Sequence, residues 1–144
     1  MDCIFCRIAK GEIDSAKIWE DEKILAFLDI NPLTRGHCLI IPKEHFENIF
    51  DLDKDILKEI IVIAKEISEK MKRSLGAKGV NLLNSNGKEA EQLVFHFHLH
   101  IVPRYENDGR KITTDRAELK VVALEELKKL AEEVKLKVAG RSDL

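Results

Sequence analysis

The chain lacks several features that define whole classes of protein. Its apolar runs are short, and the run at residues 60–64 is far too short to cross a bilayer. Charged residues interrupt the first thirty positions, which excludes the apolar core of a signal peptide. The 24 basic and 26 acidic residues leave a net charge of -2, so no overall field attracts nucleic acid or an anionic membrane. We therefore expect a cytoplasmic protein with no membrane partner and no nucleic-acid partner.

Linkers, repeats and disulfide scaffolds are also missing. The sequence has no internal repeat, no low-complexity tract and no segment rich in Gly, Pro or Ser, and 144 residues are the length of one domain. We therefore expect residues 1–144 to form a single domain. The three cysteines are too few for a disulfide scaffold, but Cys3 and Cys6 form a Cys-x-x-Cys pair. In a reducing compartment, such a pair indicates metal or redox chemistry more often than a disulfide.

The spacing of apolar residues predicts an α+β domain with a mostly antiparallel sheet. Residues 53–75 carry apolar side chains three and four positions apart and stop before Gly76, a pattern typical of a long amphipathic helix. Residues 121–138 read as a strand followed by a C-terminal helix. Short apolar runs predict strands at residues 17–19, 24–29, 37–41, 80–83 and 94–102.

Three histidines at alternate positions carry the strongest functional signal of the chain. These are His96, His98 and His100. Side chains of a strand point alternately to its two faces, so the three imidazoles would line one face. The other face would bury Phe95, Phe97, Leu99 and Ile101. Imidazole ionises near neutral pH and can act as nucleophile, base, acid or metal ligand.

Residues 96–102 resemble the signature of the histidine triad (HIT) superfamily, in which three histidines alternate with apolar residues. Residues 29–43 resemble its second diagnostic stretch, and residues 85–87 with Gln92 resemble its phosphate loop. The resemblance covers roughly residues 3–105. It is closest to the Hint-like and bacterial HIT nucleotide hydrolases, because the galactose-1-phosphate uridylyltransferases usually have Gln where this chain has His100.

The resemblance implies a HIT-like fold, a homodimer and a nucleotide substrate of the AMP or GMP type. It also implies cleavage of a phosphoanhydride or phosphoramidate at the α-phosphate. The nucleophile would be His98, which would form a nucleotidyl-histidine intermediate that water then hydrolyses. His100 would donate to the phosphate, and His37 would assist orientation or proton traffic near His98. A half-buried imidazole at the end of a strand is the alternative interpretation of His37.

The resemblance also implies a nucleotide-binding pocket. Asp29 would bind the ribose hydroxyls, with a solvated turn aspartate as the alternative. The residues expected at the phosphates are Ser85, Asn86, Gly87 and Gln92. Those expected at the base are Ile4, Phe5, Ile8, Phe27 and Leu39, each of which fits the hydrophobic core equally well. The chain departs from the family pattern at Glu91 and Leu93, which flank Gln92.

The Cys-x-x-Cys pair adds a metal site to the expectations. Two thiolates at this spacing can bind one tetrahedral zinc ion and need two further ligands. The resemblance implies that His45 and His96 supply them and that Cys3, Cys6, His45 and His96 hold one structural zinc. A redox pair and an unmetallated pair are the alternatives.

Two other functions remain open on the sequence alone. The row of three histidines would suit a metal-dependent hydrolase, because alternating histidines on a strand are a known zinc-binding geometry. A nucleotide-binding protein without turnover would use the same pocket. Binding of adenosine monophosphate without turnover of any phosphoramidate or dinucleoside polyphosphate would favour the latter.

Overall fold

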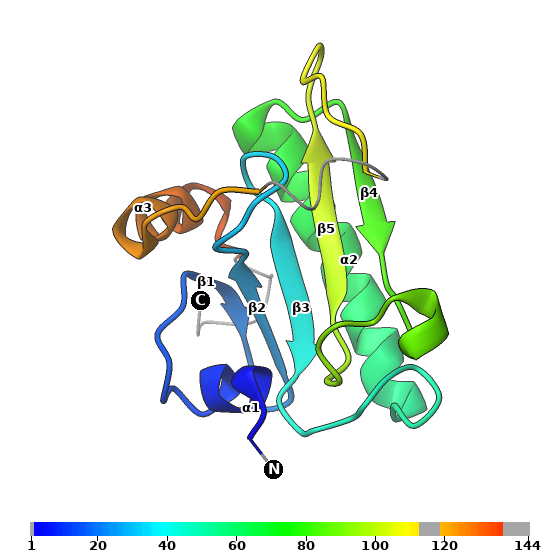
Figure 1. Ribbon diagram of the computed structural model, residues 1–144. Helices are drawn as coiled ribbons and strands as arrows, with labels where there is room; N and C mark the ends of the chain where they lie inside the picture. Colours follow the sequence, from blue (N-terminus) through cyan, green and yellow to red (C-terminus); the bar gives the residue numbers. More distant parts are fainter. Residues whose placement is uncertain (1, 113–118, 137–144) are drawn as a thin grey trace.

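The computed structural model describes residues 2–112 and 119–136 of the chain. Within these residues, five strands form an antiparallel sheet with the spatial order β1-β2-β3-β5-β4 (Figure 1). This arrangement confirms the expected α+β fold with an antiparallel sheet. The strand bounds are β1 (Lys17–Glu20), β2 (Ile24–Leu28), β3 (Cys38–Pro42), β4 (Gly79–Leu83) and β5 (Leu99–Arg104).

The long amphipathic helix is α2 (Lys54–Leu75), whose bounds agree with the sequence prediction. Its first turn is capped by the carboxylate of Asp53, which accepts hydrogen bonds from two backbone N–H groups. Its last turn ends at Gly76, which has a φ of 75°. This left-handed backbone favours glycine because a side chain would be strained there.

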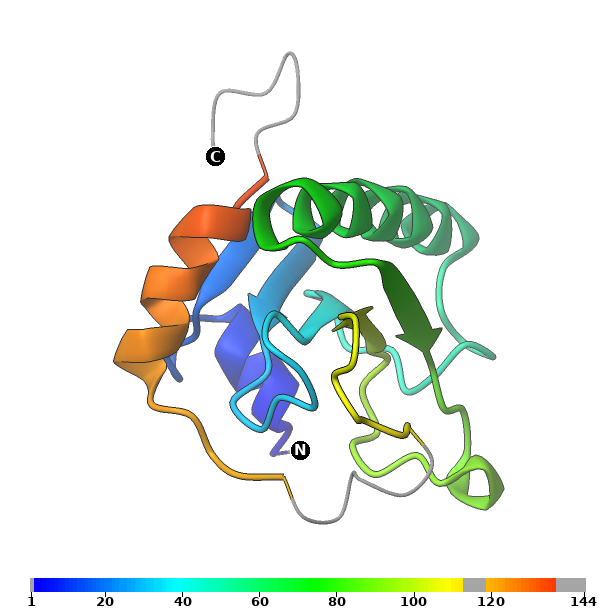
Figure 2. The same ribbon diagram turned by 90° about the horizontal axis from the view of Figure 1, so that it is seen from above.

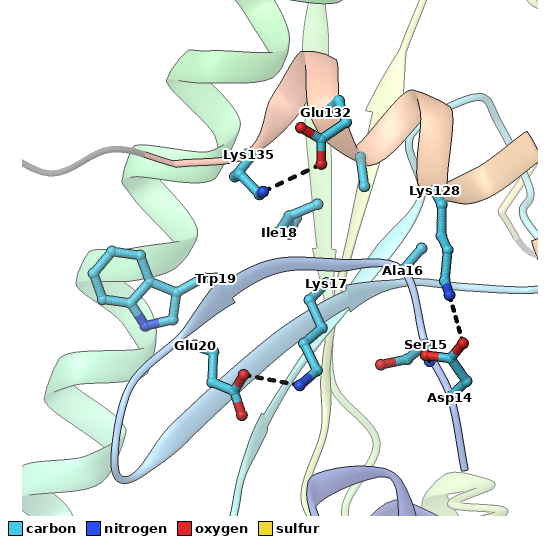
Figure 3. A pocket seen from close by; sticks show the side chains of 11 residues that line it. Asp14, Ser15, Ala16, Lys17, Ile18, Trp19, Glu20, Lys128, Glu132 and Lys135 are labelled. Carbon is cyan, nitrogen blue, oxygen red and sulfur yellow. Dashed lines mark hydrogen bonds and ion pairs between the residues drawn. The ribbon is translucent and has the colours of Figure 1, made fainter. Parts of the chain in front are cut away.

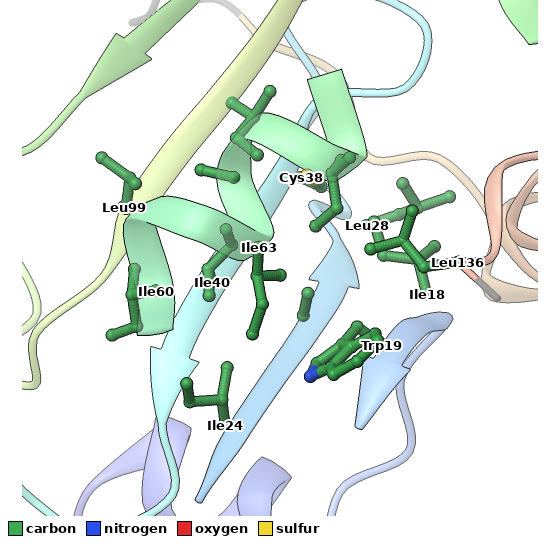
Figure 4. Packing of buried hydrophobic residues seen from close by; sticks show 14 of the residues in the cluster. Ile18, Trp19, Ile24, Leu28, Cys38, Ile40, Ile60, Ile63, Leu99 and Leu136 are labelled. Carbon is green, nitrogen blue, oxygen red and sulfur yellow. The ribbon is translucent and has the colours of Figure 1, made fainter. Parts of the chain in front are cut away.

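Helices cover both faces of the sheet. α2 and α3 (Leu124–Val134) lie on one face and α1 (Ile4–Ala9) lies on the opposite one (Figure 2). The larger hydrophobic cluster fills the space beneath α2 and α3, and Figure 4 shows part of it, including Trp19 and Ile40. The smaller cluster lies beneath α1 and consists of Phe5, Ile8, Leu25, Phe27, Leu39 and Ile41.

The strand pairing assigns His100 to the face that α1 covers. His100 lies opposite Leu39 in the antiparallel pair of β3 and β5. Directly opposed residues of such a pair share a face, and Leu39 belongs to the cluster beneath α1. The candidate site therefore lies on the α1 side of the sheet.

The histidine segment differs from the predicted strand over residues 94–102, because β5 begins only at Leu99. Two positions beyond the last pair of β3 and β5, Pro42 would face Phe97. Proline has no N–H to donate to the ladder, which disfavours further pairing with β5 there. The N–H of Phe97 instead donates to the carbonyl of Phe46 over 2.7 Å.

The strand prediction was therefore wrong for residues 94–98, although Phe5 of α1 contacts the rings of both His96 and His98, so these imidazoles still lie on the α1 side with His100. Only His100 lies within β5, whereas His96 and His98 precede it. Phe95, expected in the core, is 40% exposed. Burial of the other three apolar residues is confirmed; these are Phe97, Leu99 and Ile101.

Three smaller differences concern local structure. Neither α1 nor the 3₁₀ turn η1 (Lys88–Ala90) was expected from the sequence. The predicted strand at the start of residues 121–138 is absent, because α3 is preceded by irregular backbone whose Val122 N–H donates to the carbonyl of Ile30. Residues 137–138 of that segment lie outside the described residues. Across the described part of the chain, no helix has the length and apolarity needed to span a membrane.

Candidate functional site

Two cysteines and two histidines from distant parts of the chain meet at the amino-terminal end of α1. The ligand atoms of Cys3, Cys6, His45 and His96 all lie within 4.8 Å of one another. The Sγ atom of Cys3 is 3.3 Å from Nδ1 of His96. The Sγ atom of Cys6 is 3.3 Å from Nδ1 of His45 and 3.5 Å from Nδ1 of His96. The structure thus brings together the four residues that the sequence singled out for metal binding.

The spacing of these atoms fits a tetrahedral zinc ion. Zn–S and Zn–N bonds of ordinary length, at a tetrahedral angle, separate S from N by about 3.6 Å. The ring of His96 is oriented as a metal ligand requires, because its Nε2 lies 2.8 Å from the carbonyl of Pro42 and donates to it. Burial lowers the pKa of His96 to about 4, so its Nδ1 lone pair is available at neutral pH. The donor set therefore suits zinc in both chemistry and spacing.

The first turn of α1 places the two thiols side by side. Cys3 is the N-cap of the helix, and its Sγ accepts a hydrogen bond of 3.4 Å from the N–H of Cys6. Burial and the neighbouring Cys3 thiol raise the pKa of Cys6. The third cysteine, Cys38, is fully buried in the larger cluster and lies outside this group.

His98 has one ring nitrogen directed at the main chain. Its Nδ1 is 2.8 Å from the carbonyl oxygen of His96. A carbonyl only accepts, so Nδ1 carries the proton and the neutral ring has its lone pair on Nε2. The ring of Phe5 packs edge-on against His98 with centroids 5.1 Å apart, and the ring of His100 does so at the same separation.

The sequence interpretation missed a residue that holds His98 in place. The side-chain amide of Asn84 donates to the carbonyl of His98 over 2.9 Å. Asn84 directly follows β4, so this contact places the beginning of the expected phosphate loop beside His98. An asparagine at the end of a strand was the available signal, but asparagine is common in turns and the signal was not specific.

His37 lies against His100 and is buried rather than half-buried. It is 4% exposed, and its Nε2 is 3.0 Å from Nδ1 of His100. The carboxylate of Asp29 is 3.6 Å from the same Nε2. His37 immediately precedes β3, and the N–H of Asp29 donates to its carbonyl over 2.9 Å. The residue expected at the ribose and two of the expected catalytic histidines thus form one group.

Gln92 is buried and holds two loops together. Its Oε1 accepts a hydrogen bond of 2.8 Å from the N–H of Gly87. Its Nε2 donates to the carbonyls of Glu47 and Val94 over 2.7 and 3.0 Å. Gly87 has a φ of 97°, a backbone conformation that favours glycine. Both polar atoms of Gln92 are thus engaged within the protein, and the side chain shapes the loop from inside.

The other residues of the expected phosphate loop are half-buried. Ser85 and Asn86 follow Asn84 in the connection from β4 to η1. The Oδ1 of Asn86 accepts from the N–H of Ile49 over 2.7 Å, which ties the loop to the segment before α2. Glu91 is exposed with a left-handed φ of 64°, and Leu93 is 86% exposed. Neither departure from the family pattern is buried in the loop.

Four of the five residues expected at the base lie together in the cluster beneath α1. They are Phe5, Ile8, Phe27 and Leu39. All four are at most 8% exposed, so they form a packed apolar floor beside His98 and His100. Ile4 is separate: it is 50% exposed and lines a different hollow together with Leu93.

A hollow of about 400 Å³ between β1 and α3 contains none of the residues singled out from the sequence (Figure 3). Its lysines are paired with carboxylates: Lys128 with Asp14 and Lys17 with Glu20 at 2.9 Å. Lys135 contacts Glu132 at 3.2 Å. Among the residues that the structure describes, the charges that line the hollow are thus balanced.

Comparison with known protein families identifies the domain. The family model of the HIT domain matches residues 10–107. A protein named Protein hit from Bacillus subtilis is 46% identical over 109 residues, which cover 75% of each chain. An adenosine 5′-monophosphoramidase from Schizosaccharomyces pombe is 37% identical and covers 96% of this chain and 99% of its own. An adenylylsulfatase from Arabidopsis thaliana is 40% identical and covers 74% of this chain and 54% of its own.

Solved structures match over nearly the whole chain. A HIT-like protein from Bartonella henselae has a TM-score of 0.83 at 30% identity and covers 93% of this chain and 94% of its own. A zinc-bound histidine triad family protein from Mycobacterium smegmatis has a TM-score of 0.77 at 36% identity and covers 91% of both chains. The fold is therefore the one that these proteins share.

Proposed function

The chain belongs to the HIT family, and from this membership we propose that it is a nucleotide hydrolase. It cleaves a phosphoanhydride or phosphoramidate bond at the α-phosphate of a purine nucleotide of the AMP or GMP type. The observation that carries the proposal is the tautomer of His98. Because its Nδ1 donates to the carbonyl of His96, the Nε2 lone pair is oriented for attack on phosphorus.

The reaction has two steps. In the first, Nε2 of His98 attacks the α-phosphorus, the bond to the leaving group breaks, and the leaving group departs with the electron pair and takes up a proton from solvent. In the second, water attacks the phosphorus of the nucleotidyl-histidine and loses a proton to solvent, the bond between phosphorus and Nε2 breaks, and the nucleoside monophosphate leaves as His98 regains its lone pair. His100, whose ring packs beside His98, donates to a phosphate oxygen as charge develops there.

The pocket around His98 supports nucleotide binding. The apolar floor beneath α1 would receive the base, Asp29 would accept from the two ribose hydroxyls, and the loop at Ser85 and Asn86 would receive the phosphates. Ile4 contributes least to this assignment, because it lies outside the floor.

We assign a structural zinc ion to Cys3, Cys6, His45 and His96. Four protein ligands complete a tetrahedral shell and leave no position for a reactive water, so zinc would supply rigidity rather than catalysis. The backbone carbonyl of His96 also accepts the hydrogen bond from Nδ1 of His98. The metal site would thereby fix the residue that orients the nucleophile.

A catalytic metal held by His96, His98 and His100 has little support, because among the described residues these three do not form a group of ligand atoms within 4.8 Å, and His96 belongs to the cysteine group instead. A second group also bears on this alternative. The ligand atoms of Asp29, His37 and His100 lie within 4.8 Å of one another. However, the other nitrogen of His37 accepts from a backbone N–H, whereas a ligating imidazole ordinarily donates from that position. A nucleotide-binding protein without turnover remains the second candidate, and the assay below separates the two.

We also propose that two chains form a homodimer through α2 and β4. β4 is an edge strand of the sheet and carries Leu82, which is 43% exposed, while Ile61 of α2 is 49% exposed. Exposed apolar groups beside an unpaired edge favour pairing with a second copy. Sedimentation at micromolar concentration should give the dimer mass, and a monomer would contradict the assignment.

We also propose a cytoplasmic location, because a reducing cytoplasm suits the three unpaired cysteines.

The function is tested by turnover and by trapping the intermediate. Adenosine phosphoramidates, dinucleoside polyphosphates and adenylyl sulfate should be compared by kcat/KM, each with guanosine and pyrimidine counterparts. Acid-quenched enzyme should carry a nucleotidyl group that mass spectrometry maps to His98. His98→Ala should lower kcat by at least about a thousandfold while AMP binding persists, because it removes the attacking group only.

Two outcomes would count against this proposal. AMP binding without turnover of any substrate would identify a binding protein. A His98→Ala variant that keeps more than about a tenth of wild-type turnover would exclude the covalent mechanism. AMP affinity of each variant, measured by calorimetry, is the control for an intact pocket.

A further inference from the structure

Both ring nitrogens of His37 are engaged, and one of the partners is a backbone amide. The N–H of Leu33 donates to Nδ1 of His37 over 2.9 Å, in a buried position. On the other side of the ring, Nε2 is 3.0 Å from Nδ1 of His100. The carboxylate of Asp29 lies 3.6 Å from the same Nε2.

The backbone amide decides the tautomer of His37. A peptide N–H can donate but cannot accept, so Nδ1 of His37 must offer its lone pair to Leu33. In the neutral ring, the proton then lies on Nε2. To gain a second proton, His37 would have to give up the bond to Leu33 and leave a buried N–H without a partner. To lose the proton on Nε2, it would have to become an imidazolate.

The tautomer of His37 in turn decides that of His100. The proton on Nε2 of His37 points at Nδ1 of His100, so Nδ1 of His100 is the acceptor. The proton of neutral His100 is therefore on its own Nε2. This is the state in which His100 can donate to a phosphate oxygen beside His98.

The surrounding loop holds Leu33 and His37 at this distance. The N–H of His37 donates to the carbonyl of Thr34 over 3.1 Å, and the hydroxyl of Thr34 donates to the carbonyl of Pro103 over 2.6 Å. The loop is also packed tightly at Gly36, where φ is 95° and an added Cβ would lie 2.9 Å from a methyl carbon of Leu75. The loop is thus fastened to β5, the strand that carries His100.

We propose that His37 is a positioning residue that carries no proton during turnover, and that the backbone N–H of Leu33 sets the tautomers of His37 and His100. The catalytic consequence of this inference rests on the proposed function. The sequence left two roles open for His37, orientation or proton traffic, and the proposal assigns orientation. His37 keeps Nε2 of His100 protonated for the substrate.

The kinetic test compares two substitutions of His37. The amide nitrogen of Gln in His37→Gln reaches the place of Nε2 and still donates to His100, but it cannot take up or release a proton. His37→Leu fills the site without a donor. We expect kcat of His37→Gln to remain within about tenfold of wild type and kcat of His37→Leu to fall at least about a hundredfold. Equal losses of a hundredfold or more would show that His37 transfers a proton and would overturn the proposal.

A spectroscopic test needs no substrate and so separates this inference from the proposed function. In protein labelled with ¹⁵N at histidine, wild-type His37 and His100 should both show a protonated Nε2 and an unprotonated Nδ1 at neutral pH. In His37→Leu, the His100 signals should move toward a mixture of the two tautomers, with the thermal unfolding midpoint as the check on folding. Finding wild-type His37 protonated at Nδ1 would refute the proposal that Leu33 sets these tautomers. So would a His100 tautomer that does not change in His37→Leu. If no nucleotide is turned over while the tautomers are as expected, only the proposed function fails.

Discussion

Removal of zinc should lower the stability of this protein by a measurable and specific amount. The ligand atoms already lie 3.3 to 3.5 Å apart where the contacts are closest, near the roughly 3.6 Å between S and N in a tetrahedral site. Little rearrangement is therefore needed for binding. A ligand that binds only the folded state at a thousand times its Kd stabilises it by about 4 kcal/mol.

That free energy converts to a large thermal shift. For a chain of about 150 residues, each kcal/mol moves Tm by about 2 to 4 °C, so saturating zinc should raise Tm by roughly 8 to 16 °C over chelator-treated protein. The assay is calorimetry on metal-free protein with and without added zinc, together with elemental analysis of protein purified without added metal. We expect one zinc ion per chain.

Two cysteine variants make the result specific. Cys6→Ser removes one of the four ligands and should abolish most of the zinc-dependent shift. Cys38→Ser removes the buried cysteine that is not one of the four expected metal ligands. It should lower the absolute Tm but retain both the zinc content and the shift. The reasoning is refuted if wild-type Tm does not respond to zinc, or if Cys6→Ser responds as wild type does.

Two further predictions concern the fold around the site. Gly76→Ala should lower the free energy of unfolding, measured in urea, by about 1 kcal/mol. Gly76 has a φ of 75°, and an added Cβ would have no atom within 4 Å, so backbone strain is the only cost. The matched control is Gly79→Ala, because Gly79 is equally open but has no positive φ. This variant should change the free energy of unfolding by under about 0.5 kcal/mol. Equal losses in both variants would exclude backbone strain as the cause. Gln92→Met should cost at least about 2 kcal/mol and speed amide exchange at Gly87, since the buried amide bridges two loops; unchanged exchange at Gly87 would contradict this role.

The regular elements could be predicted because their determinants are local. α2 is defined by its apolar spacing, by Asp53 as N-cap and by Gly76 as terminator, all of which are visible in the sequence. The hairpin of β1 and β2 and the strand β3 follow from short apolar runs. In contrast, α1 has only six residues and shows too little periodicity to stand out.

The histidine segment shows where local pattern failed. Alternation predicted a strand, yet the pairs of β3 and β5 stop at Ile40 and Leu99, two positions before a proline would be needed in the ladder. The sequence does not identify β3 as the partner strand. The chain turns away, and His96 enters the metal group while His98 and His100 remain beside each other. The residues that precede β5 thus include both His96 of the proposed metal site and His98 of the candidate catalytic site.

The sequence by itself determined the family, the type of fold and the set of chemically active residues, because motifs and periodicity are properties of neighbouring positions. Only the tertiary structure decided which ring nitrogen of His96 and which of His37 holds a proton. That assignment depends on backbone groups far along the chain or across a loop: the carbonyl of Pro42 for His96 and the amide of Leu33 for His37. A hydrogen-bond partner exists only once the chain has folded, and the sequence pattern carries no information about its direction.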